Sequence, residues 1–117
     1  SSSSAASDVY KRQSTDWPQI VALYDVLYRF EASPVVLLNR AVAISMAQGP
    51  AAALPLLQAL EQNGELAQYH LLDAALADLH QKLGHTQQAR LYSQQALSKT
   101  AQQAEQRFLQ KRLETLG

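Results

Sequence analysis

Apolar residues recur at steps of three and four along most of the chain, which is the spacing of one face of an α-helix. Residues 69–83 show this spacing most clearly, and their apolar stripe consists of Tyr69, Leu72, Leu76, Leu79 and Leu83. Gly84 follows the stripe. Glycine often ends a helix because it adopts a left-handed backbone without a Cβ clash. The pattern therefore predicts a helix that stops at this glycine.

A second helix is predicted directly after Gly84. Thr86 is expected to cap it, because a threonine oxygen accepts a hydrogen bond from the free N–H groups of a first turn. Ala89, Tyr92 and Ala96 then resume the helical spacing. The two alanines allow this helix to approach the preceding one closely, and the tyrosine fills the space above them. Residues 69–97 are thus expected to form one helix hairpin.

Four more helices are expected, over about residues 16–30, 34–48, 50–62 and 101–116. Their starts carry typical signals, with Thr15 or Asp16 as a cap before Pro18, and Ser33 as a cap before Pro34. The expected buried stripes are Ile20, Leu23, Leu27 and Phe30 beside Tyr24; Val35, Leu38, Val42 and Met46; Ala53, Leu56, Leu57 and Leu60; and Ala104, Phe108, Leu109, Leu113 and Leu116.

Pro55 conflicts with a regular helix over residues 50–62. A proline inside a helix removes one backbone hydrogen bond and clashes with the preceding turn, at a cost of roughly 3 kcal/mol. Two interpretations remain open. Either the helix is kinked at Pro55, or its regular part begins only near that residue.

The helices are organised as a repeat. Gly49 and Gly84 each separate two helices, and they lie 35 positions apart, close to the period of about 34 residues in tetratricopeptide (TPR) repeats. We therefore predict an all-α fold, a TPR-like right-handed stack of antiparallel helix hairpins with about six helices. The first helix would lack a partner at the front of the stack, so apolar surface is expected there unless another part of the protein covers it.

Composition narrows the possible functions. The 117 residues suffice for one domain, and the formal net charge is zero, which argues against a strong overall field for nucleic acid or anionic lipid. The absence of cysteine excludes disulfides and thiolate zinc sites. No apolar run is long enough to span a bilayer. The serine-rich residues 1–14 are interpreted as a non-native or disordered tract, and residues 15–117 as a domain from a longer protein.

The sequence contains no constellation that indicates catalysis. His70, His80 and His85 lack the spacing of a metal-ligand pair, the carboxylates are scattered, and no glycine-rich phosphate loop occurs. We therefore expect no enzyme activity, no metal and no cofactor. His70 is expected to bond to a neighbouring helix, and the sequence interval between His80 and His85 is expected to place them on different faces.

Polar residues suggest two kinds of contact. Residues 85–117 carry five basic and two acidic side chains, and Arg107 and Lys111 share one helix face. This face is either a solvated surface or a docking surface for an acidic partner or a nucleic-acid backbone. Within the second helix, Asn39 is expected to bond across to the first. Arg40 is expected to pair with an acid, for which the candidates are Asp16, Asp25 and Asp73.

Six segments in one order resemble a known family, the C-terminal TPR-like extension of bacterial extracytoplasmic-function (ECF) sigma factors. The segments are DWPQIVALYDVL (16–27), SPVVLLNRAVAI (33–44), GP (49–50), YHLLDAALADLHQKLG (69–84), ARLYSQQAL (89–97) and AEQRFLQKRL (104–113). The resemblance covers about residues 15–116. It departs from the family at Asp73 and Leu76, where relatives tend to have basic or histidine residues.

The resemblance implies a cytoplasmic, regulatory role in transcription initiation, without direct DNA binding by this fragment and without membrane attachment. The implied partners are the sigma core domains in the same polypeptide, RNA polymerase, and a small YCII-related protein. The residues expected to dock are Arg40, His70, Arg107, Lys111 and Arg112. The residues expected to hold the fold are Trp17, Tyr24, Pro34, Asn39, Gly49, Tyr69, Gly84, Ala89, Tyr92, Ala96 and Phe108, and Asp16 and Glu105 also match the family pattern. The alternative is a free-standing TPR-like adaptor that binds a peptide or a partner helix in its groove.

Overall fold

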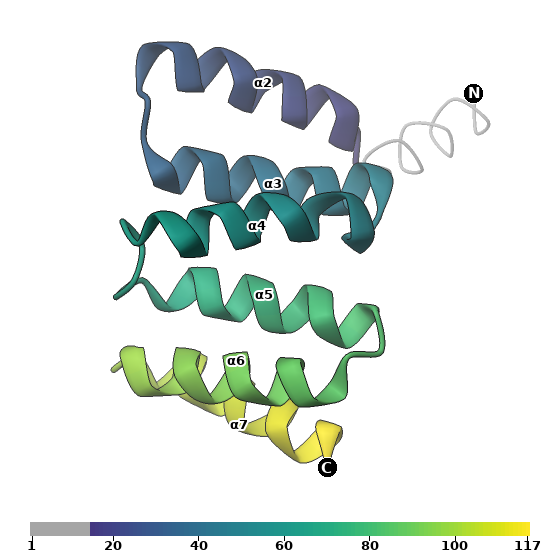
Figure 1. Cartoon of the computed structure of the whole chain (residues 1–117), viewed down its shortest axis with the longest axis vertical. Coiled ribbons are helices and arrows are strands. Elements are labelled where there is room, and N and C mark those ends of the chain that lie inside the picture. Colours follow the sequence, from purple (N-terminus) through teal and green to yellow (C-terminus); the bar gives the residue numbers. More distant parts are fainter. Residues whose placement is uncertain (1–14) are drawn as a thin grey trace, which may run out of the picture.

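The computed structural model describes residues 15–117, and every regular element in this part of the chain is an α-helix (Figure 1). The helices are α2 (Trp17–Phe30), α3 (Pro34–Gln48), α4 (Pro50–Asn63), α5 (His70–Lys82), α6 (Thr86–Lys99) and α7 (Gln103–Leu116). The predicted all-α class is confirmed for these residues. The tract assigned to residues 1–14 lies outside the described residues.

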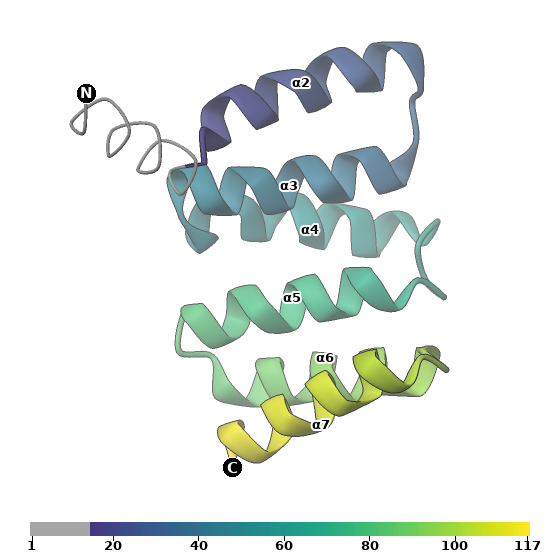
Figure 2. The same cartoon turned by 180° about the vertical axis from the view of Figure 1, so that it is seen from behind.

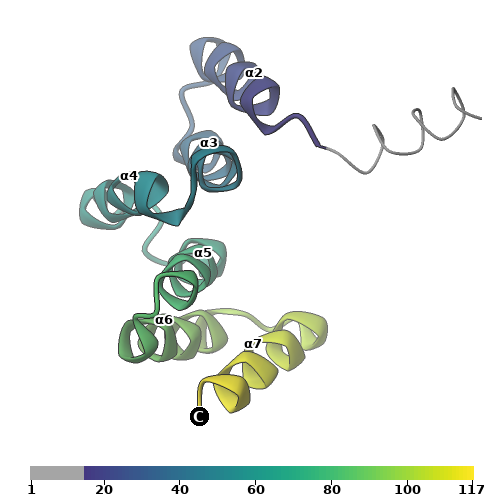
Figure 3. The same cartoon turned by 90° about the vertical axis from the view of Figure 1, so that its right-hand side faces the viewer.

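Consecutive helices pack against each other from α2 to α7, with the most extensive packing between α5 and α6. Viewed along the helix axes, α3 and α5 lie in one row and α4 and α6 in a second row (Figure 3). α3 also contacts α5 directly. Each hairpin therefore stacks on the next, which is the arrangement expected for a TPR-like repeat. Within residues 15–117, no helix combines the length and the apolar content needed to cross a membrane.

Side-chain caps set the starts of α2 and α3, and a glycine separates α3 from α4. The Asp16 carboxylate accepts a hydrogen bond from the Gln19 backbone N–H at 3.1 Å, and the Ser33 hydroxyl accepts one from the Val35 N–H at 3.2 Å. Pro34 is the first residue of α3, as predicted. Gly49, with a φ of 100°, separates α3 from α4.

The predicted cap of α6 is wrong. His85 occupies the N-cap position without a side-chain capping bond, and Thr86 is the first residue of the helix. The reason is the way α5 ends. The Gly84 N–H donates to the Gln81 carbonyl at 3.1 Å, and the His85 N–H donates to the His80 carbonyl at 2.8 Å. These two hydrogen bonds form a Schellman motif. The chain therefore enters α6 one residue earlier than predicted.

Pro55 lies inside α4, which runs without interruption from Pro50 to Asn63. The alternative in which the helix begins near Pro55 is therefore wrong. Pro55 and Ala51 are both exposed. Water can therefore reach the Ala51 carbonyl, which a proline at position 55 leaves without its helical donor.

The core lies between α3, α4 and α5. Its buried members are Leu38, Ala41, Ile44, Ala53, Leu57, Leu60, Leu66, Leu72, Leu76 and Leu79. Tyr69 and Tyr92 pack against this cluster. Ala89 and Ala96 are fully buried, as the close approach of α6 to α5 requires. The predicted stripe of α5 is thus confirmed for its three central leucines.

The predicted stripe of α2 is largely wrong. Leu23, Leu27 and Phe30 are exposed, and no residue of α2 is fully buried. Ile20 and Tyr24 are half-buried. Among residues 15–117, α2 packs extensively only on α3, so these residues cover one side of this apolar helix. The apolar front surface expected from the repeat pattern is therefore present in the structure.

Five further stripe positions are exposed, contrary to prediction: Val42, Met46, Leu56, Ala104 and Phe108. α3 contacts α2, α4 and α5, so its buried surface extends to Val36 and Ala43 and leaves Val42 and Met46 outside. On α7, Leu109 is fully buried. Because successive helical residues point about 100° apart, burial of Leu109 turns Phe108 toward the surface.

Candidate protein-docking surface

The exposed side of α7 carries an aromatic ring with two cations beside it. Phe108 is 57% exposed, and Arg107 and Lys111 are exposed beside it. Among residues 15–117, no ion pair joins Arg107 or Lys111 to another side chain. Both cations are therefore available to an acidic group outside the described structure. We call Arg107, Phe108 and Lys111 the α7 surface.

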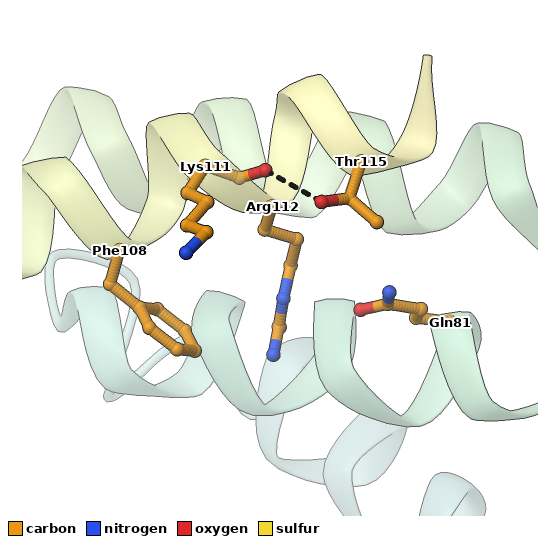
Figure 4. A pocket seen from close by; sticks show the side chains of 5 residues that line it. All are labelled: Gln81, Phe108, Lys111, Arg112 and Thr115. Carbon is orange, nitrogen blue, oxygen red and sulfur yellow. Dashed lines mark hydrogen bonds between the residues drawn. The ribbon is translucent and has the colours of Figure 1, made fainter.

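A shallow pocket adjoins this surface (Figure 4). It has a volume of about 240 Å³ and is lined by Gln81, Phe108, Lys111, Arg112 and Thr115. In Figure 4, Gln81 reaches it from α5 and the other four side chains come from α7. Small-molecule sites usually measure roughly 300–1,000 Å³. The size of this pocket suits one side chain of a partner better than a cofactor.

Arg112 fixes the geometry of the pocket. One guanidinium nitrogen donates to the Asp78 carboxylate at 3.2 Å, and the other donates to the Ala74 carbonyl at 3.4 Å. The guanidinium carbon lies 5.0 Å from the centre of the Phe108 ring, within the range of a cation–π contact. Asp78 also pairs with Lys82 at 2.9 Å. Arg112 therefore holds α7 on α5 and orients Phe108, and its charge is used within the domain.

The other two predicted docking residues also make internal contacts. The Arg40 Nε donates to the Asp25 carboxylate at 2.6 Å. Of the three carboxylates proposed as partners of Arg40, Asp25 is therefore the one that pairs with it, and the pair connects α3 to α2. His70 faces α7, where its Nε2 lies 4.0 Å from a Glu105 carboxylate oxygen. That Nε2 is buried and has no hydrogen-bond partner among the described residues. The five predicted docking residues therefore do not converge on one site.

Asn39 does not make the predicted bond to α2. Its side chain is exposed, and the cross-helix hydrogen bond comes from the adjacent Arg40. The two residues are one step apart on α3, so only one of them can face α2. Of the residues predicted to hold the fold, Asn39, Gly84 and Phe108 are exposed. Trp17, Tyr24, Tyr69 and Tyr92 are half-buried, and Ala89 and Ala96 are fully buried.

One polar cluster was not predicted. The Nδ1 atoms of His80 and His85 lie 2.9 Å apart, and the His80 ring stacks on Tyr92 with an interplanar angle of 3°. The Tyr92 hydroxyl donates to the Glu61 carboxylate at 2.9 Å. Sequence spacing alone put the two histidines on different faces. Gly84 is the sequence feature that could have predicted the contact between the two histidines, because a Schellman motif folds the chain back over the last turn of a helix.

Burial and charge alter two pKa values in this cluster. Burial lowers the pKa of His80, the neighbouring His85 lowers it further, and Glu61 opposes the change. Burial, reinforced by the hydrogen bond to Glu61, raises the pKa of Tyr92 to about 12. In residues 15–117, no group of three or more histidine, cysteine, aspartate or glutamate side chains has a metal-binding arrangement.

Comparisons with known proteins give one informative similarity. No protein-family model and no solved structure matches the chain. An uncharacterized protein of Rhizobium meliloti (strain 1021) is 35% identical over 105 residues, which cover 90% of this chain and 24% of that protein. The chain thus spans about a quarter of the length of this relative.

Proposed function

We propose that residues 15–117 form a regulatory, protein-docking domain of an ECF sigma factor, acting in transcription initiation without catalysis of its own. The order of the family-like segments along the chain supports the sigma-factor assignment. The observation that carries the docking role is the α7 surface, in which an exposed Phe108 adjoins two exposed cations that have no ion-pair partner among the described residues.

The α7 surface has properties that favour binding. Aromatic and arginine side chains dominate the energetics of protein interfaces. Phe108 is already oriented by its contact with Arg112, so little side-chain entropy is lost on docking. Arg107 and Lys111 attract negative charge, which raises the association rate more than the affinity. The surface therefore fits an acidic segment that also presents one apolar side chain.

Three partners are consistent with this chemistry. They are the sigma core domains of the same polypeptide, RNA polymerase, and a small YCII-related protein. We place the sigma core first, because a contact within one polypeptide benefits from a high effective concentration and tolerates a small surface. The domain would then favour or hinder promoter recognition by docking on the core and leaving it.

A binding measurement with the two-domain core of an ECF sigma factor of this family tests the proposal. The 117-residue chain is titrated with that core, alone and bound to RNA polymerase core enzyme. Phe108→Ala and Lys111→Glu are each expected to weaken binding about tenfold or more, equivalent to about 1.4 kcal/mol. Arg29→Glu is the matched control, because Arg29 is an exposed cation on α2 at the other end of the stack.

Two outcomes would contradict the proposal. Absence of binding to both the core and its polymerase complex removes the sigma-factor role. An equal loss with Arg29→Glu shows that overall charge, and not the α7 surface, controls binding. Arg112 is unsuitable for this test, because its substitution also breaks the contact with Asp78.

A second candidate function rests on a groove between α3 and α4. The groove measures about 250 Å³ and is lined by Leu37, Arg40, Leu56, Ala59, Leu60 and Asn63. Its exposed leucine favours a free-standing adaptor that binds an apolar side chain of a peptide. Leu56→Glu would then abolish partner binding while Phe108→Ala leaves it intact. The sigma-factor domain predicts the reverse.

A further inference from the structure

One face of α2 is apolar, and no other helix of residues 15–117 covers it. It consists of Leu23, Val26, Leu27 and Phe30, which are 61%, 47%, 42% and 85% exposed. Their spacing of three and four places them side by side on the helix. We call these four residues the α2 face. They lie on the helix at the end of the stack opposite α7 (Figure 2).

The α2 face is unusual for the end of a repeat stack. Terminal helices of such stacks normally present a polar outer surface, because no further repeat covers them. Among residues 15–117, α2 instead carries apolar residues around most of its circumference and packs extensively only on α3. The exposed area of the four side chains is roughly 400 Å², within the range of about 300–600 Å² for the largest apolar patch of a typical monomer, and such patches are often functional.

We propose that two copies of the chain associate through the α2 face, with the two α2 helices antiparallel about a twofold axis. A twofold axis brings the same patch of both copies together. Two such patches would bury roughly 800 Å² in total, below the ~1,200–2,000 Å² of a stable specific interface, so the dimer is expected to be weak and to form only at high concentration.

Charge on α2 is compatible with this pairing. The α2 face itself is uncharged. Asp25 is engaged with Arg40 of α3, and Arg29 is one step from Phe30, which turns it about 100° away. Like charges are therefore not forced together in the interface. An antiparallel arrangement also places each helix N-terminus beside the C-terminus of the other, which the helix dipoles favour.

Sedimentation velocity of the full 117-residue chain between about 5 and 500 μM tests the proposal. The wild type should change from the 12.9 kDa monomer toward twice that mass as the concentration rises. Leu23→Glu and Phe30→Glu should keep the monomer mass throughout. Both side chains are largely exposed, so the variants should fold, which circular dichroism verifies. Phe108→Glu is the matched control, an exposed aromatic at the opposite end of the stack, and should dimerise like the wild type.

Cross-linking gives a second readout that locates the interface. The chain has no cysteine, so Leu23→Cys introduces a single thiol near the proposed axis and Phe108→Cys one far from it. Only Leu23→Cys should form dimers rapidly with a short thiol cross-linker.

A wild type that stays monomeric up to 500 μM overturns the proposal, and the α2 face then belongs to a different partner or to a further part of a longer polypeptide. A dimer that persists in Leu23→Glu, or that Phe108→Glu abolishes, overturns it as well. Equal cross-linking of the two cysteine variants would also overturn the proposal. None of these outcomes affects the sigma-core binding test, which concerns α7.

Discussion

The Nδ1 atoms of His80 and His85 lie 2.9 Å apart at the corner between α5 and α6. A hydrogen bond between two imidazole nitrogens requires that one of them be unprotonated. The backbone creates this contact, because the Schellman bond from the His85 N–H to the His80 carbonyl measures 2.8 Å. When both rings are protonated, two positive charges face each other at this corner. Protonation should therefore weaken the α5–α6 hairpin.

The first prediction concerns acid stability. The pKa of His80 lies below its ordinary value of 6.5 in the folded protein, whereas the unfolded chain retains about 6.5. The unfolded state thus binds more protons below pH 6.5. The stabilisation from neutral His80 is present above pH 6.5 and is lost as the pH falls through the lowered pKa. Urea unfolding at pH 7.5 and pH 5 should show a lower free energy of unfolding at pH 5.

His85→Asn is the informative variant for this effect. It removes one cause of the lowered pKa, the charge of His85, and leaves burial and the opposing effect of Glu61 in place. Tyr92 still covers the His80 ring. The loss of stability between pH 7.5 and pH 5 should therefore be smaller than in the wild type but not absent. An unchanged pH dependence would show that the histidine pair does not control the corner.

The second prediction concerns Gly84. Its φ is 79°, a left-handed backbone that glycine adopts without strain, and a Cβ at this position would meet no atom within 4 Å. Gly84→Ala should therefore cost only backbone strain, about 1 kcal/mol of unfolding free energy. Gly84→Asn should cost less, because asparagine tolerates this conformation. Chemical unfolding of the three proteins measures the order, and an alanine variant as stable as the wild type would contradict the motif.

Local rules explain what the sequence predicted well. Ser33, Pro34 and Gly49 define α3 because capping and backbone preferences act within a few residues. The α5 leucines were identified because α5 is covered by neighbours on both sides and its stripe faces the core. The docking role of Arg107 and Lys111 stays a prediction, although their positions on one exposed face agree with their spacing.

Tertiary surroundings explain what the sequence did not predict. Leu23 and Phe30 share one helix face, as their spacing predicts, but they are not buried, because no helix packs on that side of α2 in the described residues. Periodicity identifies an apolar face and does not reveal whether a neighbour exists. The contact between His80 and His85 depends on how the chain turns at Gly84, and a straight helix of the same sequence would separate the rings. The family resemblance assigned Arg112 to a partner, and the sequence does not show that Asp78, on another helix, lies close enough to pair with it.

The third prediction compares two leucines with identical substitutions. Leu76 is fully buried in the core, whereas Leu23 is 61% exposed. Leu76→Ala should lower the free energy of unfolding by about 2–5 kcal/mol, because it removes apolar contacts and leaves a cavity. Leu23→Ala should change it by less than about 0.5 kcal/mol when measured at concentrations that favour the monomer. Comparable losses would mean that α2 is packed on its outer side as well.

The fourth prediction concerns the ion pair between α5 and α6. The Lys99 ammonium donates to the Asp73 carboxylate at 2.7 Å, and the side chains are 23% and 5% exposed. Lys99→Met leaves a buried carboxylate without its cation, which should cost about 3–5 kcal/mol of unfolding free energy. Asp73→Asn leaves a lysine whose long side chain can extend to water, so the loss should be smaller, about 1–3 kcal/mol.

The double variant Asp73→Leu with Lys99→Met isolates the pair from the rest of the hairpin. It replaces both charges by apolar groups, so neither is left buried without a partner. Its free energy of unfolding should lie closer to that of the wild type than that of Lys99→Met does, because apolar residues often substitute for a buried ion pair. Urea unfolding of the four proteins at pH 7.5 compares these free energies. Equal losses in the two single variants would show that Asp73 keeps a second donor when Lys99 is removed.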